Sequence, residues 1–192
     1  TLYFNLQSSR LISEGRRIHL KSIAEQQGNT LDLFLRERVV NLTNMINSPE
    51  METPPSQEKM QEYFYDLKKS SYAFVDVGFF DSTGLQVKYV GPFPSLELRD
   101  YSSEAWYVSL LSKKENFIIT DIYLGFRKQP HFTIAVRQLL DGKYIVLRAT
   151  LDPNKIHEYI TSHDGTSEVH TSIVNRDGYY QLVTQHSDSL LE

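Results

Sequence analysis

The feature that most constrains this sequence is a stripe of apolar residues at helical spacing. Leu31, Leu35, Val39, Leu42 and Ile46 follow one another at steps of four, four, three and four residues. Such steps place side chains on one face of an α-helix. Looser apolar positions upstream extend the pattern. We therefore predict a helix from near residue 5 to residue 48 whose C-terminal half packs on a core.

This predicted helix is long for a chain of 192 residues, at about 60 Å for a rise of 1.5 Å per residue. We favour a stalk whose N-terminal half, residues 5–26, projects and pairs with a second copy of the chain. The alternative is two shorter helices broken at Gly28-Asn29-Thr30, since an interior glycine costs about 1 kcal/mol and Asn-Thr resembles an N-cap. Both alternatives place residues 31–46 on the core.

After the helix breaker Thr53-Pro54-Pro55-Ser56 the pattern changes from helix to strand. We predict a short helix over residues 57–69 and two more over 105–111 and 152–160. Strand-like runs cover residues 73–80, 85–90, 116–124, 131–138 and 144–151. This order predicts an α+β fold in which the long N-terminal helix packs on a five-stranded antiparallel sheet.

Alternation in the last two predicted strands separates two faces of the sheet. One face is apolar and suits the long helix: Phe132, Ile134, Val136, Ile145, Leu147, Ala149 and Leu151. The other face mixes aromatic, hydroxyl, imidazole and guanidinium groups: His131, Thr133, Arg137, Tyr144, Arg148 and Thr150. Solvent exposure alone would explain the mixed face. Alternatively, Trp106 and Tyr107 cover it and enclose a small cavity.

A covered face with these groups suits an anion. Arg148, Arg137 and His131 are the basic residues of the mixed face. A guanidinium binds a carboxylate through two parallel hydrogen bonds. A small cavity with a few convergent polar groups is the usual form of a ligand site. The sequence therefore favours a carboxylate ligand if the face is covered.

Residues 173–181 repeat a pattern seen in residues 79–86, namely two apolar residues, a polar turn, a glycine and a new strand. An isolated hairpin is barely stable. We therefore expect a second, related unit that begins here. The predicted organisation is a stalk helix over 1–48, a main unit over 49–160, and a linker with the truncated start of a second unit over 161–192.

Composition excludes several classes of protein. Twenty Lys and Arg against 24 Asp and Glu give a net charge of −4, so we expect no nucleic-acid partner. Cysteine is absent, which excludes disulfides and thiolate sites. The sequence has neither a run of about 18 apolar residues nor a signal peptide, and it begins without Met. We expect a portion of a longer protein.

The sequence also lacks the common catalytic motifs. It contains no Gly-x-Ser-x-Gly, no His-Glu-x-x-His, no Gly-rich phosphate loop and no Asp-x-Asp calcium loop. His157, His163 and His170 do not have the spacing of metal ligands. We therefore expect no catalytic residue, no metal site and no cofactor in this portion, and hence no enzymatic activity of its own.

The chain resembles the double Cache (PDC) domain, the extracytoplasmic sensor module of many two-component histidine kinases and chemoreceptors. The similarity covers nearly the whole chain. The motifs that carry it are Phe34-Leu35-Arg36-Glu37-Arg38, Phe79-Phe80-Asp81-Ser82-Thr83-Gly84, Trp106, Thr120-Asp121-Ile122-Tyr123-Leu124-Gly125-Phe126-Arg127, Pro130 to Val136, and Leu147-Arg148-Ala149-Thr150-Leu151-Asp152. The last series is more similar to sensor kinases than to chemoreceptors.

The resemblance implies two PAS-like units on a helix that emerges from a membrane span. Residues 49–160 would form the membrane-distal unit, on the periplasmic or extracellular side, and would bind a small molecule. The full-length protein would then be a membrane-anchored histidine kinase that dimerises through this helix. The alternatives are a chemoreceptor, a cyclic-nucleotide-type output enzyme behind the same sensor, or a periplasmic binding or structural module without kinase output.

The resemblance also suggests the ligand-binding residues. Members that bind amino acids carry Arg two residues before the Trp and Asp on the last strand, where this chain has Glu104 and Thr150. These departures favour an organic acid or another small anion over a free amino acid. The candidate ligand-binding residues are Trp106, Tyr107, Tyr123, Arg127, His131, Thr133, Arg148 and Thr150.

Overall fold

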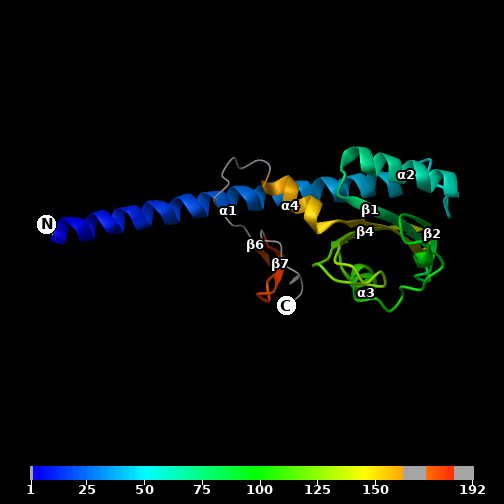
Figure 1. Cartoon of the computed structure of the whole chain (residues 1–192). Coiled ribbons are helices and arrows are strands. Elements are labelled where there is room, and N and C mark those ends of the chain that lie inside the picture. The colour runs from blue at the N-terminus through cyan, green and yellow to red at the C-terminus, as the bar shows by residue number, and fades with distance from the viewer. Residues whose placement is uncertain (1, 162–171, 184–192) are drawn as a thin grey trace.

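A computed structural model describes residues 2–161 and 172–183 of the chain. The helices are α1 (Leu2–Ile46), α2 (Gln57–Ser70), the 3-10 helix η1 (Pro94–Leu96), α3 (Ala105–Ser112) and α4 (Pro153–Thr161). The strands are β1 (Phe74–Phe80), β2 (Gln86–Val90), β3 (Phe117–Ile119), β4 (Phe132–Leu140), β5 (Lys143–Leu151), β6 (Ser172–Val174) and β7 (Tyr180–Val183). Figure 1 shows α1 and α2 on one side of the main sheet and α3 on the other.

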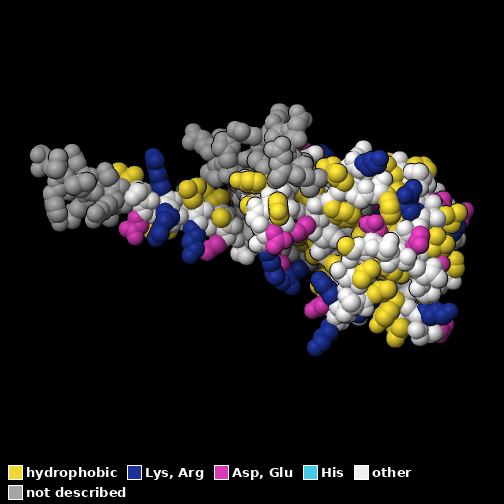
Figure 2. Space-filling model, turned by 90° about the horizontal axis from the view of Figure 1, so that it is seen from below, with side chains coloured by type: hydrophobic (Ala, Val, Ile, Leu, Met, Phe, Trp, Pro, Cys, Tyr) yellow, Lys and Arg dark blue, Asp and Glu magenta, His cyan; other side chains and the backbone are white. Residues whose placement is uncertain are grey.

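Helix α1 is continuous from Leu2 to Ile46, so the alternative of two helices broken at residues 28–30 is wrong. The Thr30 hydroxyl donates to the Gln26 carbonyl one turn earlier, within the helix, and does not cap a new one. The N-terminal half of α1 projects beyond the sheet (Figure 1), and charged side chains of both signs lie on the part of it from residue 12 onward (Figure 2). Among the described residues, no helix is both long and apolar enough to span a membrane.

The main sheet has five antiparallel strands in the order β2-β1-β5-β4-β3, which confirms the predicted α+β fold. The tight turn at Asp141-Gly142 joins β4 to β5, and both residues have positive φ angles, of 49° and 77°. The paired strands then run in register from Phe132–Leu151 to Leu140–Lys143.

The two faces of the sheet belong to two separate cores, as the alternation of residues predicts. The larger core joins α1, α2 and α4 to the apolar face: Phe34, Leu42, Ile46, Met60, Leu67, Ile134, Val136, Leu147, Ala149 and Ile156. The smaller core joins α3 to the opposite face: Phe80, Tyr101, Trp106, Tyr107, Leu110, Ile118, Ala135 and Val146. The face of mixed residue types is therefore covered, and simple solvent exposure does not explain it.

The predicted strand over 116–124 is wrong beyond Ile119, where β3 ends. Residues 120–131 form a loop instead. Within it, Tyr123 and His131 exchange backbone hydrogen bonds of 3.2 and 3.1 Å, and Gly125 takes a φ of 53° that a strand does not allow. The η1 turn after β2 is a further element that the sequence did not predict.

Strands β6 and β7 form the predicted C-terminal hairpin, with Gly178 at a φ of 88° in its turn. The hairpin contacts the loop after β3, because the Gln181 side chain accepts a hydrogen bond of 2.6 Å from the Ile122 amide. The second unit that we expect over 161–192 lies in large part outside the described residues, as do His163 and His170. The three-part division of the chain stays a prediction.

Candidate ligand-binding site

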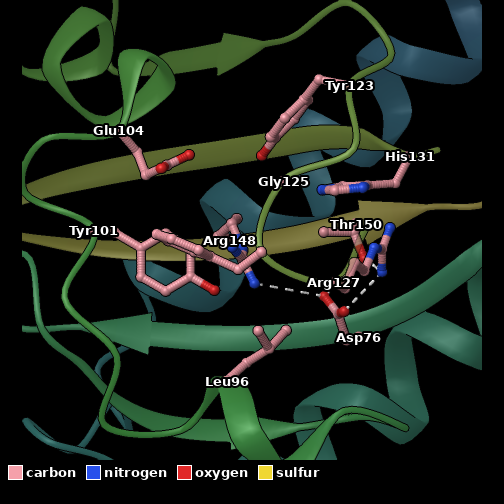
Figure 3. A pocket seen from close by; sticks show the side chains of 11 residues that line it. Asp76, Leu96, Tyr101, Glu104, Tyr123, Gly125, Arg127, His131, Arg148 and Thr150 are labelled. Carbon is pink, nitrogen blue, oxygen red and sulfur yellow. Dashed lines mark hydrogen bonds and ion pairs between the residues drawn. The ribbon is translucent and has the colours of Figure 1, made fainter. Parts of the chain in front are cut away.

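A small cavity lies on the covered face of the sheet, between strands β1, β4 and β5 and the loop after β3 (Figure 3). Its volume is about 10 Å³, which is no more than one water molecule needs. Its wall is formed by Asp76, Leu96, Tyr101, Glu104, Tyr123, Gly125, Phe126, Arg127, His131, Arg148 and Thr150. The cavity is therefore polar, enclosed by aromatic rings, and closed to anything larger than water.

Arg148 on β5 is a buried cation of this cavity, with a side chain that is only 3% exposed. Its guanidinium carbon lies 4.9 Å from the Tyr101 ring centre, 5.3 Å from that of Phe80 and 5.7 Å from that of Trp106. Its Nε and Nη2 atoms make no hydrogen bond with any described residue. Buried donors without an acceptor are costly, so this geometry suits a ligand that supplies one.

Asp76 on β1 is the fully buried anion of the same cavity. Its Oδ2 lies 2.9 Å from Arg127 Nη1, and its Oδ1 accepts a hydrogen bond of 2.7 Å from the Thr150 hydroxyl. Arg148 Nη2 lies farther away, 3.8 Å from Oδ1 (Figure 3). The Tyr89 hydroxyl also donates to Asp76, at 3.3 Å. Asp76 therefore neutralises Arg127 directly and Arg148 in part.

The two guanidinium groups respond differently to this burial. Burial lowers the pKa of Arg127, and the nearby Asp76 offsets only part of that effect. Burial also lowers the pKa of Arg148, but Asp76 and the hydroxyls of Tyr101 and Tyr123 outweigh it, so that this pKa lies above its ordinary value. Both side chains stay charged at neutral pH all the same, because arginine is not deprotonated in proteins.

His131 and Tyr123 close one side of the cavity. Their rings lie 4.4 Å apart between centres, and the Tyr123 hydroxyl is 2.8 Å from that of Thr133 on β4. Burial, assisted by the charge of Arg127, lowers the pKa of His131 to about 4. The imidazole is therefore neutral near pH 7, and it adds a polar surface without a charge. Burial likewise raises the pKa of Tyr123.

The cavity wall carries two arginines and two carboxylates, but only one arginine and one carboxylate form a close pair. Arg127 and Asp76 form a close pair, whereas Glu104 reaches into the cavity from the side opposite Asp76 (Figure 3). The free donors belong to Arg148, as described above, and to Arg127 Nε, which also makes no hydrogen bond with a described residue. An anion that reaches these donors would satisfy them.

Five of the eight predicted site residues line this cavity: Tyr123, Arg127, His131, Arg148 and Thr150. Thr133 lies directly behind it, through its contact with Tyr123. Trp106 and Tyr107 lie in the aromatic core beside it. Trp106 stacks edge-to-face with Phe80, and the Tyr107 hydroxyl donates to the Asp81 carbonyl. Their part in ligand binding stays a prediction.

Arg137 does not join the cavity, contrary to the sequence prediction. Its guanidinium donates hydrogen bonds of 2.7 Å to the carbonyls of Leu110, Leu111 and Lys113 at the end of α3. It therefore anchors that helix to β4. The sequence placed Arg137 on the correct face but could not show how far along the strand the cavity lies.

Sequence reasoning missed Asp76 as a site residue. The signal that could have found it is a single carboxylate within the apolar run Phe74-Val75-Asp76-Val77 of β1, because a buried charge must have a partner. Tyr101 and Leu96 were missed for another reason. Leu96 ends the short 3-10 helix η1 and Tyr101 lies in the irregular segment before α3, and in neither place does a periodicity indicate which side chains point inward.

A second, more open hollow adjoins the cavity. It has a volume of about 340 Å³ and shares Glu104 and Tyr123 with the cavity wall. Its other lining residues come from α3, β3 and the loop that follows β3: Ala105, Trp106, Ser109, Ile118, Thr120 and Asp121. Glu104 and Tyr123 therefore separate the closed cavity from this surface groove.

The structure is similar to several solved sensor domains. The ligand-binding domain of the Pseudomonas aeruginosa PAO1 amino acid chemoreceptor PctB, in complex with L-Arg, matches with a TM-score of 0.66 and 18% identity over 91% of this chain and 68% of that one. The extracellular domain assigned to the histidine kinase vpHK1S-Z8 matches with a TM-score of 0.62 and 16% identity over 83% and 65%.

A third similar structure is the ligand-binding domain of the Campylobacter jejuni chemoreceptor Tlp3 in complex with 4-methylisoleucine, with a TM-score of 0.58 and 15% identity over 86% of this chain and 69% of that one. The chain thus spans about two thirds of the length of these domains. No family model and no curated protein matches the sequence. The chain has the fold of extracellular sensor domains of histidine kinases and chemoreceptors, which confirms the resemblance predicted from its sequence.

Proposed function

We propose that this chain is an extracytoplasmic sensor domain that binds a small molecule with a carboxylate or similar anionic group at Arg148. The observation that carries the proposal is the fully enclosed Arg148 guanidinium, whose Nε and Nη2 donors have no acceptor among the described residues. The shared fold with extracellular ligand-binding domains supports the sensor role.

The chemistry of the wall favours an anion over a neutral ligand. Asp76 makes its close contacts with Arg127 and Thr150. The positive charge of Arg148 therefore has no carboxylate within hydrogen-bond distance, since Asp76 Oδ1 lies 3.8 Å from its Nη2. A carboxylate that replaces water at a desolvated guanidinium gains a charge-assisted hydrogen bond of the stronger kind. An organic acid is larger than the cavity of about 10 Å³, so binding requires the cavity to open, and the three rings around Arg148 would then enclose the apolar part of the acid.

In this proposal the signal from the ligand site leaves the domain through α1. Arg148 and Thr150 of β5 point into the cavity, whereas Leu147 and Ala149 between and beside them belong to the core that α1 shares. We propose that a ligand which moves β5 shifts its packing against α1, and that α1 carries the shift across a membrane to a histidine kinase. The ligand can bias this equilibrium only by its difference in affinity for the two packings.

In this proposal the chain itself catalyses no reaction, and its location is periplasmic or extracellular. The alternatives to the kinase are a chemoreceptor and an output enzyme of another type, since the similar solved domains include both histidine kinases and chemoreceptors. Sequence that follows a second membrane span in the full-length protein would distinguish them. A phospho-accepting histidine region supports the kinase, and a long heptad hairpin supports the chemoreceptor.

The test is a thermal-shift screen of the purified chain against organic acids, amino acids, amines and sugars. A ligand at 100 times its dissociation constant stabilises the folded state by about 2.7 kcal/mol. We expect an acid to raise the melting temperature of the wild type but not of Arg148→Met. Arg36→Met on the exposed face of α1 is the matched control and should retain the response.

Two outcomes would contradict the proposal. If an acid stabilises Arg148→Met as much as the wild type, then Arg148 is not the anion-binding group. If only amines or sugars stabilise the chain, then the ligand class is wrong, although the sensor role could stand. Isothermal titration of the same acid against wild type and Arg148→Met gives an independent measure of the affinity.

A further inference from the structure

Arg127 enters the cavity from a loop, whereas Arg148 enters it from strand β5. It lies on the loop of residues 124–130, whose ends are joined by the Tyr123–His131 bridge. Its neighbours Phe126 and Lys128 are exposed, yet its own side chain is 3% exposed. The loop therefore lies on the surface and inserts one charged side chain into the cavity.

Three groups surround one edge of the Arg127 guanidinium, while its Nε makes no hydrogen bond with a described residue. Nη1 donates to Asp76 Oδ2 and to the Thr150 hydroxyl, both at 2.9 Å. The guanidinium carbon lies 5.4 Å from the centre of the Phe93 ring. A carboxylate, a hydroxyl and an aromatic ring on three different segments are the elements by which proteins bind guanidinium groups.

Two of these groups, Asp76 and Thr150, are held by the main sheet and not by the loop. Asp76 and Thr150 lie on the central strands β1 and β5, and they also bond to each other at 2.7 Å. The Tyr89 hydroxyl on β2 also donates a hydrogen bond to Asp76. By contrast, the loop carries two residues in the left-handed region, Gly125 and Lys128, with φ angles of 53° and 52°. Two of the three groups thus belong to the main sheet, whereas Arg127 reaches them from a loop.

We propose that Asp76, Thr150 and Phe93 form a guanidinium-binding subsite, and that Arg127 occupies it as a tethered internal ligand. The subsite would accept a guanidinium or amidinium group from a free molecule whenever the loop withdraws. This inference deepens the proposed function, because the subsite opens on the cavity at Arg148, and withdrawal of Arg127 would enlarge a space that now measures about 10 Å³. Its test requires no ligand for Arg148.

The experiment is chemical rescue of Arg127→Ala in the whole chain with ethylguanidinium chloride. We expect Arg127→Ala to unfold at a lower temperature than the wild type. Ethylguanidinium at ten times its dissociation constant should then raise that melting temperature by about 4 °C. The wild type should not respond, because its own side chain fills the subsite. Lys128→Ala, an exposed neighbour on the same loop, is the matched control and should behave as the wild type.

Two comparisons make the rescue specific. Ethylammonium chloride at the same ionic strength should have no comparable effect, and an equal effect of both salts would overturn the inference. The double variant Asp76→Asn with Arg127→Ala should lose the response, and a response that persists would likewise overturn it. If Arg127→Ala does not fold, its refolding yield from urea replaces the melting temperature. Recovery with ethylguanidinium then supports the subsite, and no recovery contradicts it.

The outcomes separate this inference from the proposed function. If ethylguanidinium rescues Arg127→Ala while no acid binds the wild type, then the subsite stands and the proposed ligand at Arg148 fails. If an acid binds through Arg148 but ethylguanidinium does not rescue Arg127→Ala, then Arg127 is an ordinary structural ion pair and the inference fails.

Discussion

Leu147 and Arg148 are neighbours on β5, yet their side chains lie in different cores on opposite faces of the sheet. Leu147 is fully buried in the core that includes Phe34 of α1, whereas Arg148 lies among the rings of the second core. Strand β5 alone therefore separates the cavity on one face of the sheet from the core that α1 shares on the other. A movement of β5 at Arg148 necessarily displaces Leu147 relative to α1.

The first prediction concerns the contribution of Leu147 to the core that α1 shares with the sheet. Leu147→Ala removes buried methyl groups and should lower the free energy of unfolding by about 2 to 5 kcal/mol, measured by urea denaturation. Leu139→Ala on β4 is the matched control, since Leu139 is 59% exposed and should cost little. A small effect of Leu147→Ala would contradict the tight packing of α1 on the sheet.

The second prediction concerns Asp76. Asp76→Asn removes the only close anion of Arg127 among the described residues and leaves the guanidinium buried without compensation. Loss of one partner from a buried ion pair costs about 3 to 5 kcal/mol in the free energy of unfolding. Asp66→Asn on the exposed face of α2 should change that energy by less than about 0.5 kcal/mol. Equal effects of the two substitutions would show that the Asp76 pair contributes nothing.

The third prediction is a dependence of stability on pH through His131. Its pKa is about 4 in the folded chain against an ordinary value of 6.5, so the unfolded chain binds more protons between these values. Stability from the neutral imidazole is therefore complete above pH 6.5 and falls as the pH drops toward 4. At 1.36 kcal/mol per pH unit, the loss is about 3 kcal/mol at most.

His131→Asn tests this dependence, because an Asn amide can replace Nδ1 as donor to the Gln129 carbonyl without titrating. The charged groups that face His131, namely Asp76, Arg127 and Arg148, are present in both proteins. The difference between the two curves of unfolding free energy against pH therefore reports His131. His19→Gln on the exposed part of α1 should leave the curve unchanged. Parallel curves for wild type and His131→Asn would contradict the lowered pKa.

The fourth prediction concerns the close contact between Gly125, on the loop that carries Arg127, and the His131 ring. Gly125 and Gly142 both have positive φ, so alanine at either position pays the strain of the left-handed region, about 1 to 2 kcal/mol. A Cβ at Gly125 would also lie 2.9 Å from His131 Cε1, whereas a Cβ at Gly142 meets nothing within 4 Å. Gly125→Ala should therefore destabilise the chain more than Gly142→Ala in urea denaturation. Equal losses would show that the contact with His131 does not constrain the loop.

Much of the fold could be predicted because the relevant signals are local. The helical stripe of α1 and the alternation of β4 and β5 depend on residues a few positions apart. The contact between Asp76 and Arg127 joins residues 51 positions apart through an irregular loop, and no local pattern specifies it. The sequence therefore indicated which residues share a face, but not which of them meet.

Arg137 shows the limit of that reasoning, and it provides the last prediction. In the register of β4 and β5, Arg137 lies opposite Val146, while Ala135 lies opposite Arg148. Arg137 therefore lies two residues farther along β4 than the position opposite Arg148, which places it beside the end of α3 and away from the cavity. Arg137→Lys keeps the charge but loses the fork that reaches three carbonyls, so it should lower the free energy of unfolding by about 2 kcal/mol.

Arg137→Lys should leave the affinity for any acid found in the thermal-shift screen unchanged, whereas Arg148→Lys should weaken it. Arg36→Lys on α1 controls for the substitution itself, because that side chain is 75% exposed and should change neither quantity. Affinity is measured by isothermal titration and stability by urea denaturation on the same preparations. A loss of affinity in Arg137→Lys that exceeds its loss of stability would return Arg137 to the binding site, where the alternation of residues first placed it.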